Sequence, residues 1–226
     1  MMKWTTKCLY CDNLVYTLSD KRVKCSVCYK KNSIQKINRV ITLIYAFINN
    51  ESAFHIAKRS FYSYVSVQKY YKEFRIICAT ICESQYENLR SNQCEYEEYF
   101  YLEKAKIKQK DSVFDAHNFL TFDYNNHIYT LLMPSLYHYK EQFIEDSLED
   151  TYISEFNKFK RDRRIIKVSS YHNNIVKFWK YFETQILHYK GVSRESFIYY
   201  LKEYEFKYNH TQSEAIDLLI KNYFKA

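Results

Sequence analysis

The chain has 226 residues, 47% of them hydrophobic, and carries 34 Lys or Arg against 26 Asp or Glu. This length and apolar content exclude a wholly disordered chain and leave room for one sizeable core or a few small modules. The single Gly and single Pro leave most turns to Asn, Asp and Ser, which tolerate left-handed backbone best among residues with a side chain.

The first residues, MMKWTTKC, lead into a cysteine motif and lack the apolar core of a signal peptide. No apolar run reaches the length of a membrane span. We therefore expect a soluble cytoplasmic protein without a membrane partner. Thiols stay reduced there, so paired C-x2-C motifs favour metal binding over disulfides.

The positive charge is concentrated in the first third of the chain. Residues 1–75 carry 14 Lys or Arg against 4 Asp or Glu, whereas the rest carries 20 against 22. A basic head on a near-neutral body predicts a polyanionic partner, most simply nucleic acid.

Residues 1–32 contain two C-x2-C pairs separated by thirteen residues. Each pair can place two thiolates on one tight turn, and a short hairpin between them can bring both turns around a tetrahedral Zn²⁺. A module this small has almost no core, so the metal would supply its folding energy. We predict a zinc ribbon with a structural metal, since four cysteines close the coordination shell. The predicted ligands are Cys8, Cys11, Cys25 and Cys28.

The pattern becomes helical from Ser33, a predicted N-cap, to a stop at Asn49-Asn50. The stretch ESAFHIAKRSF predicts a second helix that buries Phe54, Ile56 or Ala57, and Phe61. A third helix begins after Ser63 and is predicted to turn Val67, Tyr71 and Phe74 inward.

Two helices joined by a tight turn describe a helix-turn-helix, which we assign to a domain of residues 33–92. Any three-helix bundle could share this pattern, but the neighbouring ribbon and the basic charge favour DNA binding. The outer face of the third helix would enter the major groove, where Gln68 could read a base edge and lysines could bind phosphate. The predicted DNA-binding residues are Tyr64, Gln68, Lys69 and Lys72.

The remaining chain mixes strands and helices. Residues 77–93 form a helical connector, and QCEYEEYFYLEK then alternates like a strand. FLTFDY and HIYTLLM flank Asn125-Asn126, a two-residue turn that hairpins prefer. TYISEF and RRIIKVSS are further strand candidates. Two helices are predicted over residues 173–189 and 193–208, separated by Gly191. Outside the ribbon, Cys78, Cys82 and Cys94 are predicted to be small core residues.

Residues 171–210 resemble the carboxy-terminal signature of transposases from small bacterial insertion sequences, the group with a zinc ribbon, a helix-turn-helix and a ribonuclease-H-like DDE domain. That signature has a Phe-Trp pair, a Gly, a Ser-Phe and a Leu-Lys-Glu-x-Glu-Phe-x-x-Asn run. The residues in register are Phe178, Trp179, Gly191, Ser196, Phe197, Leu201, Lys202, Glu203, Glu205, Phe206 and Asn209.

Two further stretches carry the same resemblance. CEYEEYFYLEK is similar to the family's first catalytic strand, which would place Glu97 at its first catalytic aspartate. TYISEFNKF resembles the strand of the second aspartate, which would place Glu155 there. The third catalytic position falls on Asn173, with Asn174 as the neighbouring alternative.

The resemblance implies two Mg²⁺ ions held by carboxylates, which catalyse DNA cleavage and strand transfer. Both aspartates of the family are glutamates here, and the longer side chain displaces the ligand oxygens from the positions that Mg²⁺ requires. Two hypotheses follow: a transposase, active or catalytically degenerate, or a non-catalytic regulator that kept the ribbon and helix-turn-helix. A third hypothesis, an RNA-binding zinc ribbon, explains the basic head but leaves residues 171–210 without a role.

The predicted fold class is thus multi-domain α+β. Its domains are a zinc ribbon (1–32), a helix-turn-helix domain (33–92) and a ribonuclease-H-like mixed α/β domain (93–226). The expected cofactors are a structural Zn²⁺ and, if the protein is catalytically active, Mg²⁺. The implied setting is bacterial, on double-stranded DNA at transposon ends near the nucleoid, where the protein would assemble as a homo-oligomer.

Overall fold

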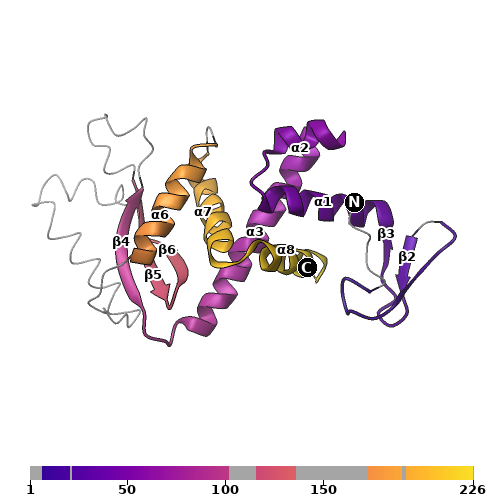
Figure 1. The fold of residues 1–226 in the computed structure, drawn as a ribbon, viewed down its shortest axis with the longest axis horizontal. Coiled ribbons are helices and arrows are strands. Elements are labelled where there is room, and N and C mark those ends of the chain that lie inside the picture. Colours follow the sequence, from indigo (N-terminus) through magenta and orange to yellow (C-terminus); the bar gives the residue numbers. More distant parts are fainter. Residues whose placement is uncertain (1–6, 21, 102–115, 136–172, 190–191, 226) are drawn as a thin grey trace, which may run out of the picture. The chain divides into compact units, whose positions relative to one another are not determined.

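The structure is a computed structural model that describes residues 7–20, 22–101, 116–135, 173–189 and 192–225. These residues form a mixed α+β fold with six helices and two three-stranded antiparallel sheets (Figure 1). The chain divides into two compact units, one of Met1–Ile81 with Phe206–Ala226 and one of Cys82–Glu205. None of the helices among the described residues has the length and apolar character needed to cross a bilayer.

The amino-terminal sheet is formed by β1 (Val15–Thr17), β2 (Arg22–Cys25) and β3 (Lys31–Ser33), in that order. The hairpin of β1 and β2 confirms the predicted connection between the cysteine pairs. Among the described residues of this sheet and its turns, the buried apolar side chains are those of Cys8, Val23 and Cys25. So small an apolar core cannot hold the module together without a further cross-link.

Four helices complete the first unit: α1 (Ile34–Ile48), α2 (Ala53–Ser60), the first part of α3 (Tyr64–Leu89) and α8 (Gln212–Lys225). Ser52 caps α2 by accepting a hydrogen bond from the His55 amide at 3.2 Å. The inward positions predicted for the third helix are confirmed, since Val67, Tyr71 and Phe74 are buried.

The prediction that Phe54 and Phe61 are buried is wrong, because they are 62% and 95% exposed. Helix α2 has only eight residues and buries Ile56 and Ala57 instead. Phe61 is the C-cap of α2 and has left-handed backbone, with φ of 57°. The chain therefore turns there, and the ring lies outside the apolar face of the helix.

Helix α8 has no counterpart among the elements predicted from sequence, and it packs against α1. Its start carries a capping box, in which Thr211 and Glu214 bond each other's backbone amides. The Thr-Gln-Ser-Glu sequence of residues 211–214 was the local signal for this helix.

The second sheet consists of β4 (Glu95–Tyr101), β5 (His117–Tyr124) and β6 (His127–Leu132), paired in that order. Asn125 and Asn126 have φ of 52° and 71°, which confirms the predicted two-residue turn. One face packs on the end of α3, where Tyr86 stacks on Tyr129 with ring centroids 3.9 Å apart. Tyr96 lies on this same face, in the same buried cluster.

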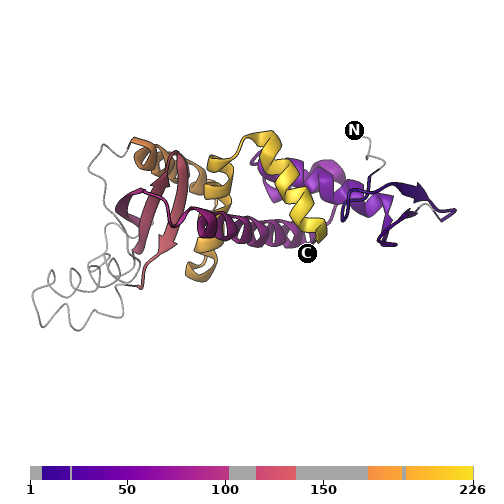
Figure 2. The same cartoon turned by 90° about the horizontal axis from the view of Figure 1, so that it is seen from below.

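Helix α6 (Asn173–Ile186) lies along the other face of the sheet (Figures 1 and 2). Its buried Trp179 donates from Nε1 to Thr121 Oγ1 at 3.0 Å and stacks on Tyr99 with centroids 4.2 Å apart. The alternation predicted for β4 is therefore confirmed, with Tyr96 and Tyr99 on opposite faces.

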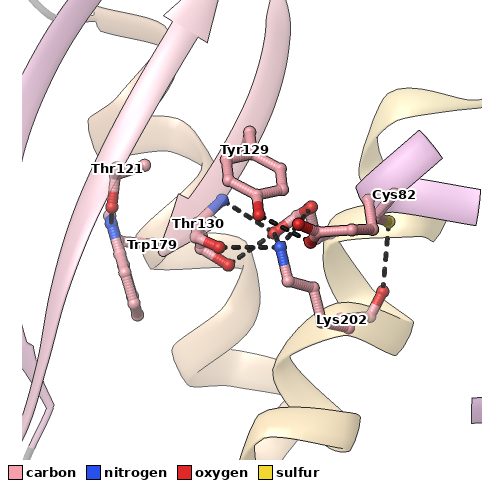
Figure 3. A network of polar contacts seen from close by, with 8 residues as sticks. Cys82, Thr121, Tyr129, Thr130, Trp179 and Lys202 are labelled. Carbon is pink, nitrogen blue, oxygen red and sulfur yellow. Dashed lines mark hydrogen bonds and ion pairs between the residues drawn. The ribbon is translucent and has the colours of Figure 1, made fainter. Parts of the chain in front are cut away.

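Helix α7 (Arg194–Asn209) contacts the backbone of β6, the last strand of the sheet in the described part of the chain. Lys202 Nζ donates to the Thr130 carbonyl at 2.7 Å, and the Thr130 amide donates to Glu205 Oε2 at 2.8 Å (Figure 3). Lys202 and Glu205 also form an ion pair of 2.9 Å, with their side chains 7% and 1% exposed. The pair thus satisfies a strand edge that would otherwise expose unpaired backbone groups.

An aromatic ring completes this buried network. Lys202 Nζ lies 3.7 Å from the centroid of the Tyr129 ring, and the Tyr129 hydroxyl donates to Glu83 Oε2 at 2.7 Å. Burial raises the pKa of Tyr129, and the neighbouring Glu83 carboxylate raises it further. A raised pKa keeps this hydroxyl protonated at neutral pH, as its donation to Glu83 requires.

We expect Lys202→Met to lower the free energy of unfolding by about 3–5 kcal/mol, because it leaves the buried Glu205 carboxylate without its cation. The measurement is urea unfolding followed by the fluorescence of Trp179. It uses a Trp4→Phe background, because the chain has two tryptophans and only Trp179 reports on this part of the fold.

The matched control is Arg90→Met, which removes a pair of the same spacing with Glu87, 3.0 Å apart but with side chains 58% and 49% exposed. That change should cost less than about 1 kcal/mol. Equal losses in the two variants would show that burial of Lys202 and Glu205 contributes nothing.

Candidate metal centre and nucleic-acid interface

The four predicted zinc ligands lie together. The Sγ atoms of Cys8, Cys11, Cys25 and Cys28 all lie within 4.8 Å of one another. The Sγ atoms of Cys8 and Cys28 are 3.6 Å apart, and those of Cys11 and Cys25 are 3.5 Å apart. Tetrahedral Zn²⁺ with Zn–S bonds of about 2.3 Å places sulfurs about 3.8 Å apart, so the donor set and its spacing fit zinc.

The two C-x2-C turns are built alike. In each, the residue after the second cysteine has left-handed backbone: Asp12 and Tyr29 both have φ of 58°. Backbone amides point at the sulfurs, from Tyr10 to Cys8 Sγ at 3.5 Å and from Val27 to Cys25 Sγ at 3.4 Å. Amide donors stabilise thiolates, the form that binds metal.

The thiols of this cluster do not share one acidity. Hydrogen bonds from Asn13 lower the pKa of Cys11 to about 6. An amide hydrogen bond from Lys30 lowers the pKa of Cys28, but burial and the neighbouring thiols outweigh it and raise that pKa to about 12. Zn²⁺ binds cysteine as thiolate, so metal binding would release the protons that these thiols still carry.

Zinc in such a site supplies folding energy and leaves no open coordination position. Cys8 and Cys25 are buried while Cys11 and Cys28 are partly exposed, so the site is open to metal entry on one side. The other three cysteines, Cys78, Cys82 and Cys94, are buried core residues, as predicted.

The start of α3 presents the polar face that the sequence predicts. Tyr64, Gln68, Lys69 and Lys72 are all exposed, and the Gln68 amide donates from Nε2 to the Tyr64 hydroxyl at 2.8 Å. This bond restricts the rotation of the Gln68 side chain while leaving its oxygen as an acceptor. The exposed Val65 lies beside them, in the first turn of the helix.

The predicted catalytic residues are only partly described. Glu97 is exposed on β4, directly opposite Thr121 of β5, which places it on the face that α6 covers. Asn173 is the first residue of α6. Glu155 lies outside the described residues, together with the strand candidates TYISEF and RRIIKVSS and with Gly191.

Sequence patterns did not single out Asp123 as a site residue. It pairs directly with Glu95 across β4 and β5, and both lie on the face of the sheet that carries Glu97. The Asn125-Asn126 turn joins β5 to β6 and does not set the register between β4 and β5, so no local signal pointed to this pair.

Comparison with models of protein families, with curated proteins and with solved structures finds no significant match.

The metal site predicts about one zinc per chain in protein purified without chelator, because four thiolates complete one tetrahedral shell. We expect Cys25→Ser to lose this zinc, whereas Cys78→Ala, a change of a buried cysteine outside the site, should retain it. Metal content is measured by release to a chromogenic chelator. Stoichiometric zinc in the Cys25 variant would contradict the assignment.

Proposed function

We propose that this protein binds double-stranded DNA, as the transposon-end-binding component of an insertion-sequence transposase or of a regulator derived from one. The observation that carries the proposal is the exposed start of α3. There, Gln68 is oriented by Tyr64, and two lysines lie on the same helix one turn apart. Arrangements of this kind read base edges with the amide and contact phosphates with the cations.

The short α2 supports this function. Helix α3 begins four residues after α2 ends, and Phe61 makes the tight turn between them. The basic residues Lys58 and Arg59 lie in the last turn of α2, close in sequence to this junction. Positive charge at the junction of the two helices suits contacts with the DNA backbone.

The resemblance in residues 171–210 supports the link to transposases. Its Lys202 and Glu205 are buried against β6, which gives the signature a structural role in holding α7 to the sheet. A three-stranded meander with a helix on one face is compatible with the first half of a ribonuclease-H-like domain.

We expect the full zinc-loaded chain to bind a fluorescein-labelled duplex with an affinity that falls as salt rises. The double variant Lys69→Gln/Lys72→Gln should bind more weakly, with a slope of log K against log salt reduced by about 1.8, or 0.9 for each lost phosphate contact. Fluorescence anisotropy over a salt series measures both quantities.

The matched control is Lys177→Gln/Lys180→Gln, which removes the same charge from two exposed lysines of α6 at the same spacing. Its salt slope should stay at that of the parent chain. An equal reduction of the salt slope in both double variants would show that binding depends only on the net charge of the chain. The proposal for α3 would then fail.

A second candidate function, Mg²⁺-dependent DNA cleavage and strand transfer, is favoured by the exposed Glu97 on the α6 side of the sheet. With Asn173 at the start of α6, it would offer the oxygen ligands that Mg²⁺ prefers. The ions would stabilise the attacking and leaving oxygens of the phosphodiester.

The cleavage test is nicking of a supercoiled plasmid that carries the DNA flanking the gene. If the chain is active, Glu97→Gln should reduce nicking about a hundredfold or more, because metal-site geometry tolerates little displacement. No nicking by the native chain, together with nicking by Glu97→Asp/Glu155→Asp, would leave DNA binding as the function and discard catalysis.

A further inference from the structure

The outer face of the amino-terminal sheet carries a row of aromatic and basic side chains that the zinc site does not use. Tyr16 of β1 lies directly opposite Lys24 of β2, and Lys24 lies directly opposite Lys31 of β3. Residues paired in this way share one face of a sheet, with strands about 4.8 Å apart. We call the set of Tyr16, Arg22, Lys24, Tyr29 and Lys31 the ribbon outer face.

The two faces of this sheet differ in the burial of their side chains. Val23 and Cys25, which alternate with Lys24 along β2, are buried on the other side. Tyr16 is 47% exposed and Tyr29 is 66% exposed. Lys24 Nζ lies 5.3 Å from the centroid of the Tyr29 ring, and Lys24 is also the cross-strand neighbour of Tyr16.

The electrostatics of the face favour an anion. Like charges directly opposite each other in a sheet are destabilising, and Lys24 and Lys31 occupy such a pair. The acidic residue nearest in sequence, Asp20, is engaged by Arg22, whose Nε donates to Oδ2 at 2.7 Å. Hydrogen bonds from Arg22 lower the pKa of Asp20, and the charge of Lys31 lowers it further to a lesser extent.

We infer that the ribbon outer face binds single-stranded nucleic acid, with an unpaired base stacked on Tyr16 and the backbone phosphates held by Lys24 and Lys31. Aromatic rings on a sheet surface, flanked by cations, are suited to bases whose faces are open. In a duplex, neighbouring base pairs cover those faces. This binding uses none of the residues of α3, so it is independent of the duplex binding proposed above.

The test uses the full zinc-loaded chain with fluorescein-labelled oligo(dT) and oligo(rU), which distinguish DNA from RNA. Tyr16→Leu should weaken binding of the preferred oligomer by about fivefold to a hundredfold, the range for one lost base stack. Tyr16→Phe should bind like the parent chain because it keeps the ring. The matched control is Tyr199→Leu, at a tyrosine of α7 that is 39% exposed and should leave the affinity unchanged.

The lysines are tested by Lys24→Gln/Lys31→Gln, which should reduce the salt slope for the single strand by about 1.4, or 0.7 for each phosphate. Zinc content is measured for every variant. If Tyr16→Leu loses zinc, the lysine variant and Tyr16→Phe decide the outcome.

Single-strand binding that both Tyr16→Leu and the lysine variant leave unchanged would overturn the inference, as would the absence of any single-strand binding. A parent chain that binds single strands but no duplex would instead contradict the function proposed for α3. Single-strand binding that depends on Tyr16 would survive that result, so the two failures are distinguishable.

Discussion

The convergence of four thiols is the constraint on which the amino-terminal sheet depends. The described residues of that sheet and its turns bury only Cys8, Val23 and Cys25 among their apolar side chains, so burial alone gives little free energy of folding. The short strands are held in register by the two cysteine turns, whose left-handed residues Asp12 and Tyr29 direct the sulfurs to one point. Because the apolar residues face the reverse side, the outer face is left to tyrosines and lysines.

The second unit is held by a different kind of contact. Its sheet is covered on one face by aromatic packing around Trp179, and the edge of β6 is covered by Lys202 and Glu205 of α7. A lysine that donates to a strand carbonyl and a glutamate that accepts from the amide of the same residue replace the contacts of a neighbouring strand. This explains why a charged Leu-Lys-Glu-x-Glu-Phe run can lie in a helix that is buried from residue 201 to 206.

Local signals in the sequence predicted much of this fold. Cysteine spacing predicted the metal cluster, apolar periodicity predicted α1 and the inward face of α3, and Asn125-Asn126 predicted the hairpin turn. The errors have a common physical origin in tertiary context. Phe54 and Phe61 follow an apolar pattern, but the eight-residue α2 has too little buried face for them.

Other features could not be found from local patterns. The packing of α8 on α1 joins segments far apart in the chain, and no periodicity encodes such a contact. The burial of Lys202 and Glu205 follows from a strand edge more than 70 residues away, with sequence separations of 72 and 75 to Thr130. The row of Tyr16, Lys24 and Lys31 depends on a pairing register between three short strands, which the sequence leaves open.

The central proposal is that the amino-terminal unit binds nucleic acid and that the start of α3 contacts the DNA duplex. Hydrogen–deuterium exchange of the full zinc-loaded chain, with and without a DNA duplex, tests it most directly. We expect exchange to slow in residues 60–72 on addition of the duplex, and to stay unchanged in α6 of the second unit. Unchanged exchange in residues 60–72, or protection confined to Cys82–Glu205, would contradict the account.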